Sequence, residues 1–104
     1  MFFLIKLLSV YLLVQYNISA KQINYTNIFK DTLLEYNIIY DKLDTFKSGA
    51  ICIPTEINKV FSKYAVGFSH SIYKKQTAKK IALGGCQEMK KKLISYDCKC
   101  ELIL

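Results

Sequence analysis

The stretch KQTAKKIALGGCQEMKKKLISYDCKCELIL, residues 75–104, decides the fold, because its apolar periodicity changes once along its length. Over residues 75–94 apolar side chains recur every three or four positions, which is typical of a helix with one buried face. That face consists of Ala78, Ile81, Ala82, Cys86, Met89 and Leu93. Gly85 also lies on this apolar side, where a missing side chain would allow close contact with a sheet. The alternative is that the helix breaks at Gly84 and Gly85, since each costs about 1 kcal/mol relative to Ala.

After the predicted helix, apolar side chains recur at every second position. Cys98, Cys100 and Leu102 share one side of residues 97–104, so a final strand is expected there. Upstream, residues 59–69 also alternate and predict a half-buried strand. Its apolar positions are Val60, Tyr64, Val66 and Phe68, with Ser62 as the exception.

The N-terminal half predicts a helix and a short strand. Residues 27–44 carry an apolar stripe formed by Phe29, Leu33, Tyr36, Tyr40 and Leu43. Asn27 would cap this helix, with Asp31 near the positive end of its dipole. Residues 50–54 predict an edge strand that ends at Pro54. We therefore expect an α+β domain, a small antiparallel sheet covered on one face by a long amphipathic helix and cross-linked by disulfides.

The first twenty residues predict export. Lys6 precedes an apolar core at residues 7–14, and Ala20 provides a small residue for cleavage. A membrane span needs about 20 apolar residues, so a cleaved signal peptide is favoured over an uncleaved anchor. Residues 21–104 would then form a single small secreted or periplasmic domain. Asn24-Tyr25-Thr26 is a glycosylation sequon, which is used only in a eukaryotic secretory pathway.

Four cysteines in a short exported chain indicate two disulfides. They are Cys52, Cys86, Cys98 and Cys100. Neighbours two apart on a strand are poorly placed to pair, so Cys98 and Cys100 should bond elsewhere. Cys86 lies on the helix face that covers this strand. We expect Cys86 to pair with Cys98 or Cys100 and Cys52 to pair with the other, and the choice between these two pairings is open.

Three segments together resemble a group of small exported bacterial domains of unknown function. They are Ala65-Val66-Gly67-Phe68-Ser69, Ala78-x3-Ala82-Leu83-x2-Cys86 and Cys98-x-Cys100, within residues 64–103. The chain departs from the group at residues 70–73, where the group has an aromatic and Gly-rich turn. The resemblance implies the strand–helix–strand order and a helix–strand disulfide, and it implies no activity.

The charge is basic and uneven. The chain has 15 Lys, no Arg and 8 acidic residues. Residues 59–104 hold 10 Lys against 3 acids, which favours an anionic partner such as a membrane, a glycan or an acidic protein. The abundance of Ile, Asn, Tyr and Lys is also what an AT-rich genome produces. The absence of Arg disfavours specific nucleic-acid binding.

The sequence predicts no enzyme, metal or cofactor. The one histidine, His70, lies between two serines that an extended backbone would point to the opposite face, so a solvated loop residue is expected. The carboxylates Asp31, Glu35, Asp41 and Asp44 form no catalytic pattern. A metal site of His70 with Cys86, Cys98 and Cys100 lacks the paired C-x2-C spacing of structural zinc.

The lysines of the long helix are the candidate site. Lys74, Lys75, Lys79 and Lys80 lie at its start, and Lys90, Lys91 and Lys92 lie at its end. Lysines at a helix C-terminus favour the dipole, whereas those at the N-terminus oppose it. We therefore expect a binding module that docks anionic surfaces or acidic partners. The alternative is a structural or envelope protein whose surface is merely rich in lysine.

Overall fold

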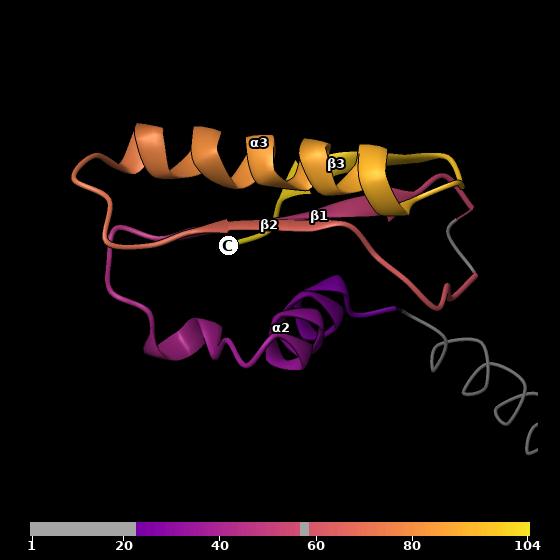
Figure 1. Ribbon diagram of the computed structural model, residues 1–104, viewed down its shortest axis with the longest axis horizontal. Coiled ribbons are helices and arrows are strands. Elements are labelled where there is room, and N and C mark those ends of the chain that lie inside the picture. Colours follow the sequence, from indigo (N-terminus) through magenta and orange to yellow (C-terminus); the bar gives the residue numbers. More distant parts are fainter. Residues whose placement is uncertain (1–22, 57–58) are drawn as a thin grey trace, which may run out of the picture.

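The fold is an α+β domain in which a three-stranded sheet lies between two helices (Figure 1). The computed structural model describes residues 23–56 and 59–104, so the predicted signal peptide lies outside the described residues. The elements are α2 (Tyr25–Glu35), the short 3-10 helix η1 (Tyr40–Lys42), β1 (Ser48–Pro54), β2 (Val66–Ser69), α3 (Lys75–Leu93) and β3 (Cys98–Leu102). The strand–long helix–strand order expected for the C-terminal half is confirmed.

The sheet is antiparallel with the order β2-β1-β3. The prediction that residues 50–54 form an edge strand was wrong, because β1 is the central strand and begins at Ser48. Pro54 suggested an edge because it has no N–H to donate to a neighbouring strand. It is instead the last residue of β1, opposite Cys98 of β3 and beyond the end of the pairing with β2, which reaches only Ile51. At that position the missing N–H is tolerated.

Small residues line the sheet face beneath α3. Ala50, Cys52 and Ala65 pack there against Ala82 and Cys86 of the helix. The helix lies close to the sheet at Gly67 and Gly85, because a Cβ placed on Gly85 would lie 3.3 Å from the Gly67 Cα. The helix continues through both glycines, as the close-contact interpretation of Gly85 predicted. Ile81 and Leu93 of the predicted apolar stripe are 44 % and 47 % exposed, since they lie toward the margins of this narrow contact.

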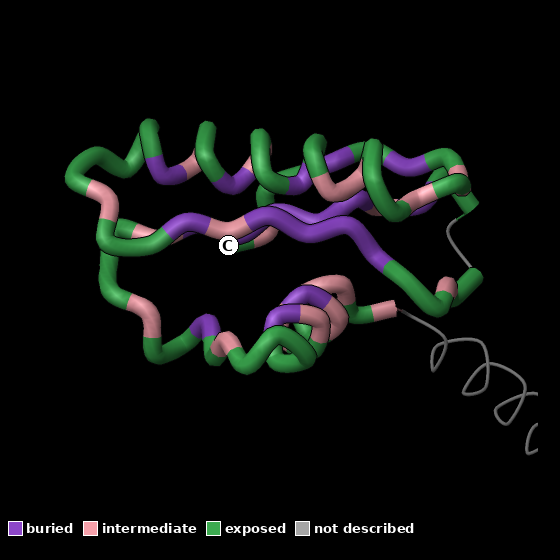
Figure 2. The backbone as a smooth tube through the Cα atoms, in the orientation of Figure 1, coloured by how far each residue is buried: buried purple, intermediate pink, exposed green. Residues whose placement is uncertain are grey.

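Larger side chains fill the opposite face of the sheet, which α2 covers (Figures 1 and 2). Phe29 and Leu33 of α2 and Tyr40 of η1 are buried against Ile51 and Val66. The sheet is therefore covered on both faces, by α3 with small residues and by α2 with large ones. The deeply buried part of β1 and β2 in Figure 2 results from this double cover.

The predicted first helix is shorter than residues 27–44. Asn24, not Asn27, is its N-cap, and the Asn24 side chain accepts a hydrogen bond from the Asn27 N–H at 3.1 Å. The helix ends at Glu35, two residues before Asn37, whose φ of 63° is left-handed. Tyr36 therefore leaves the apolar stripe and is 55 % exposed.

The strand predicted over residues 59–69 is limited to β2. Tyr64 and Val66 are buried, but Val60 is exposed and lies outside the sheet. The alternation of apolar and polar residues in the sequence therefore extends beyond the residues of β2 that pair with β1.

The two disulfides link Cys52 to Cys98 and Cys86 to Cys100, which selects one of the two expected pairings. Cys98 and Cys100 are buried on the same face of β3, as their spacing predicted. The first bond joins β1 to β3, and the second joins α3 to β3. Both bonds lie in the layer between the sheet and α3.

Candidate functional site

The lysines of α3 form two separate clusters. The N-terminal lysine cluster consists of Lys74, Lys75, Lys79 and Lys80, and the C-terminal lysine cluster consists of Lys90, Lys91 and Lys92. Lys91 lies eleven positions after Lys80, which corresponds to about 16 Å along a helix. At about 100° per residue, Lys80 and Lys91 lie on the solvent side, whereas Lys79 and Lys92 lie on opposite flanks. The lysines therefore do not form one continuous helix face.

The N-terminal lysine cluster opposes the helix dipole. The N-cap residue is Lys74, whose side chain makes no capping hydrogen bond, and the first turn contains no acidic residue. The unpaired N–H groups at this end carry partial positive charge, and lysines beside them repel it. Lys74, Lys75 and Lys80 are exposed, and Lys79 is partly buried. This end of α3 is thus strongly electropositive.

The C-terminal lysine cluster has a structural explanation. Its charges lie where the dipole is negative, and this favours the helix. Lys90 is partly buried, and its ammonium donates a hydrogen bond to the Cys98 carbonyl at 2.7 Å. That bond ties the end of α3 to the start of β3. Lys91 and Lys92 are exposed.

His70 and Ser71 lie within hydrogen-bond distance of each other, whereas Ser69 is bonded elsewhere. His70 is exposed, and its ring lies parallel to that of Phe68, with 6.1 Å between the ring centroids. The expectation that neither serine points at His70 was wrong, because Ser71 Oγ lies 3.2 Å from His70 Nδ1. The cause is the left-handed φ of 55° at Ser71, which ends the extended backbone. Ser69 instead donates to the Ala78 carbonyl at 2.7 Å.

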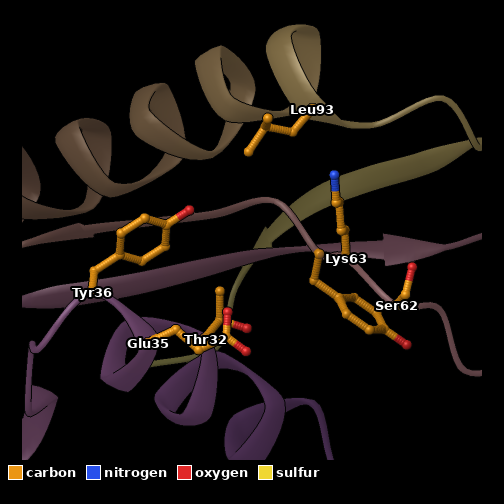
Figure 3. A pocket seen from close by; sticks show the side chains of 7 residues that line it. Thr32, Glu35, Tyr36, Ser62, Lys63 and Leu93 are labelled. Carbon is orange, nitrogen blue, oxygen red and sulfur yellow. The ribbon is translucent and has the colours of Figure 1, made fainter.

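A small cleft of about 210 Å³ lies between the C-terminal end of α2 and the segment that precedes β2 (Figure 3). Its lining residues are Thr32, Glu35, Tyr36, Ser62, Lys63, Tyr64 and Leu93. The ammonium of Lys63 is directed toward α3, whereas the carboxylate of Glu35 lies on the α2 side (Figure 3). Ligand sites for drug-sized molecules are about 300–1,000 Å³. The cleft therefore offers neither the volume nor a paired acid and base for such a ligand. The sequence marked Ser62 only as an exception to the strand alternation and did not predict a cleft there.

An aromatic cluster borders this cleft. Tyr96 stacks on Phe61, with 3.9 Å between ring centroids, and its hydroxyl donates a hydrogen bond to the Lys63 carbonyl at 2.6 Å. Burial, with the nearby Tyr64 and Tyr25 as smaller causes, raises the pKa of Tyr96 to about 12. The cluster fixes the segment before β2 against the end of α3 and needs no ligand to explain it.

The four cysteines and Asp41 are engaged within the fold. All four cysteines form disulfides, so they provide no thiolate for a metal. Asp41 forms an ion pair with Lys30 at 3.1 Å. No cluster of three or more His, Cys, Asp or Glu side chains suited to a metal is found within residues 23–56 and 59–104.

Comparison of the chain with protein-family models, with curated proteins and with solved structures gives no match. Among the helices that the structure describes, none has the length and apolar character needed to cross a bilayer. Among the charged groups that the structure describes, the N-terminal lysine cluster is one that the fold itself leaves unexplained.

Proposed function

We propose that the chain is a small exported binding module that docks on an anionic surface through the N-terminal lysine cluster of α3. One observation carries the proposal. Lys74 and Lys75 oppose the dipole at the first turn of their own helix, and Lys79 and Lys80 add positive charge one turn further on, so helix stability does not account for the charge at this end. Within the described residues the only ion pair joins Lys30 and Asp41, far from α3 in sequence. An anionic partner would supply the missing countercharge.

The proposal assigns the C-terminal lysine cluster a lesser role. Lys90 is held by the Cys98 carbonyl, and Lys91 and Lys92 favour the dipole. The absence of Arg disfavours specific nucleic-acid binding, because bidentate phosphate recognition relies on the guanidinium group. We infer no catalytic role, since His70 is exposed and has no buried partner.

The two disulfides indicate an oxidising compartment, because cytosolic thiols are kept reduced. We propose more specifically that residues 1–20 are a signal peptide and that the domain is released after Ala20. The intact mass of exported protein tests this: a chain that begins at Lys21 supports it, and a retained leader contradicts it. A larger mass would reveal a glycan on Asn24, which is exposed. The resemblance of residues 64–103 to small exported bacterial domains stays a prediction.

The docking proposal is tested with matched charge variants. Lys75→Gln with Lys80→Gln removes two charges from the N-terminal lysine cluster, and Lys91→Gln with Lys92→Gln removes two from the other end. Both pairs keep helix propensity nearly constant. Binding to heparin and to anionic vesicles is measured at low and at high salt, and exposed charge contacts should weaken as salt rises.

The first pair should lose most of the binding and the second pair little. Equal losses would mean that net charge alone attracts the chain, with no dedicated site. No binding even at low salt would favour the alternative, an envelope or structural protein with a lysine-rich surface.

A further inference from the structure

One end of the molecule carries exposed aromatic side chains on two segments that are hydrogen-bonded to each other. We call residues 44–46 and 71–73 the tip. They lie where β1 begins and where β2 leads into α3, at the left of Figure 1. Phe46 and Ile72 exchange two backbone hydrogen bonds, at 3.0 and 3.1 Å, and the Ser71 N–H donates to the Asp44 carbonyl at 2.8 Å. These bonds hold the two segments together beyond the end of the sheet.

The tip exposes two large rings that the fold does not use. Tyr73 is 92 % exposed and Phe46 is 47 % exposed. The backbone at both rings is hydrogen-bonded or adjoins a hydrogen-bonded residue, so the fold places both side chains at this end of the molecule. Aromatic rings placed at an ordered protrusion are typical of contact with an interface that is apolar on one side and wet on the other.

The charges next to the tip are mainly positive. Lys74 and Lys75 follow Tyr73 directly, and Lys79 lies one helical turn further on. Asp44 provides the opposing carboxylate within the tip. Lys47 contributes little outward charge, because its ammonium donates to the Tyr40 carbonyl at 3.0 Å and lies 4.7 Å from the Tyr40 ring. The tip thus combines exposed rings with a net positive border.

We propose that the tip inserts Tyr73 and Phe46 into the headgroup region of a bilayer that contains anionic lipids, while Lys74 and Lys75 contact the lipid phosphates. The inference rests on the proposed function and names the partner of the same lysine cluster. Tyrosine concentrates at membrane–water interfaces, and basic residues bind the negative surface of anionic leaflets. A folded acidic protein would need a matching pocket for two protruding rings, whereas a fluid interface accepts them without one.

A fluorescent substitution tests the position of the tip on the membrane. The chain contains no tryptophan, so Tyr73→Trp introduces a single indole at the tip. The matched control is Tyr36→Trp, because Tyr36 is 55 % exposed and lines a cleft with Leu93 at the other end of α3. Each variant is mixed with vesicles of pure phosphatidylcholine and with vesicles containing phosphatidylserine, and brominated acyl chains serve as quenchers.

With phosphatidylserine vesicles, the indole at residue 73 should shift its emission to shorter wavelength and be quenched by the bromine. The indole at residue 36 should do neither. Phe46→Ser combined with Tyr73→Ser should weaken vesicle binding by roughly tenfold or more, because the variant lacks the two rings that the bilayer would partly bury. The same pair should leave heparin binding unchanged, and Asp44→Asn should strengthen vesicle binding.

The outcomes separate the two proposals. One outcome is that the chain binds vesicles in flotation but the indole at residue 73 stays in water. This outcome would overturn the insertion and leave the lysine docking intact. Salt-sensitive heparin binding without vesicle binding would also overturn the insertion, in favour of a glycan or an acidic protein. Absence of binding to both would overturn both proposals.

Discussion

Gly67 and Gly84 should respond in opposite ways to substitution by Ala. Gly67 of β2 faces the α3 backbone, whereas Gly84 of α3 has open space around it. A Cβ on Gly67 would collide with the Ala82 carbonyl and the Cys86 N–H, which are backbone atoms that cannot rotate away. Gly67→Ala should therefore destabilise the domain by about 1–3 kcal/mol or more. Among the described residues nothing lies near the Cβ that Gly84 would gain. Gly84→Ala should stabilise it by up to about 1 kcal/mol, since Ala favours the helix.

Urea denaturation of the two variants beside the parent chain gives both free energies of unfolding. A neutral Gly67→Ala would mean that α3 does not approach β2 so closely. A destabilising Gly84→Ala would mean that the helix is interrupted there.

Tyr96 should make stability depend on pH in the alkaline range. Burial raises its pKa in the folded state to about 12 from the ordinary 10. Below pH 10 the phenol is protonated in both states, so its contribution to stability is fully present. Between pH 10 and 12 the unfolded chain loses the proton first, and stability falls. Tyr96→Phe should flatten this fall, and should itself cost about 0.5–1.5 kcal/mol through the lost hydrogen bond to Lys63.

Thermal melts at a series of alkaline pH values measure this effect, with ultraviolet absorbance to follow tyrosinate formation. The same decline with pH in Tyr96→Phe would show that another tyrosine controls it.

At the scale of elements, α2 is held to the sheet by packing alone, because both disulfides lie on the α3 side. Leu33 of α2 is buried against the sheet, whereas its neighbour Leu34 is largely exposed. Leu33→Ala should cost about 2–5 kcal/mol and should speed hydrogen exchange in α2 more than in α3. Leu34→Ala should stay within about 0.5 kcal/mol. Uniform loss of protection across both helices would show that the two layers unfold as one unit.

The elements that the sequence predicted best are those whose period is long and uninterrupted. The 19-residue α3 and the Cys98–Cys100 alternation were predicted correctly, because the residues that are apolar in the sequence pattern are also the ones that tertiary packing buries. The first helix was predicted too long, because the apolar spacing of Tyr36 and Tyr40 continues past Asn37. Asn is, after Gly, a common left-handed residue at a helix end, but the apolar spacing outweighed it in the prediction. The central place of β1 was missed because Pro54 dominated the prediction, although the strand ends there.

The residues of the candidate site could be predicted from the sequence, but their positions relative to one another could not. The sequence identified every lysine of α3, but only the fold shows that Lys90 binds the Cys98 carbonyl. Phe46 and Tyr73 lie 27 positions apart, and nothing local predicts that their segments pair. Which of Cys98 and Cys100 faces Cys86 was also undecided, because both share one face of the strand and the choice depends on where α3 crosses it.

At the scale of the whole molecule, the disulfides decide whether so small a domain stays folded. A core of this size supplies only a few kcal/mol of net stability. The bonds close separations of 46 and 14 residues, which in the chain-entropy model correspond to about 4 and 3 kcal/mol. The combined contribution of the two disulfides equals or exceeds the net stability that such a core supplies. The reduced chain should therefore unfold at 37 °C, which would restrict the folded protein to an oxidising compartment.

Thermal unfolding with and without reductant measures this dependence. The pair Cys86→Ala with Cys100→Ala should melt between the oxidised and reduced parent, and Cys52→Ala with Cys98→Ala should melt lower, because its loop is longer. A reverse order would mean that the link from α3 to the sheet matters more than loop length. If the reduced parent melted as high as the oxidised one, the core alone would hold the fold. The inference from the cysteines to the compartment would then lose its physical basis.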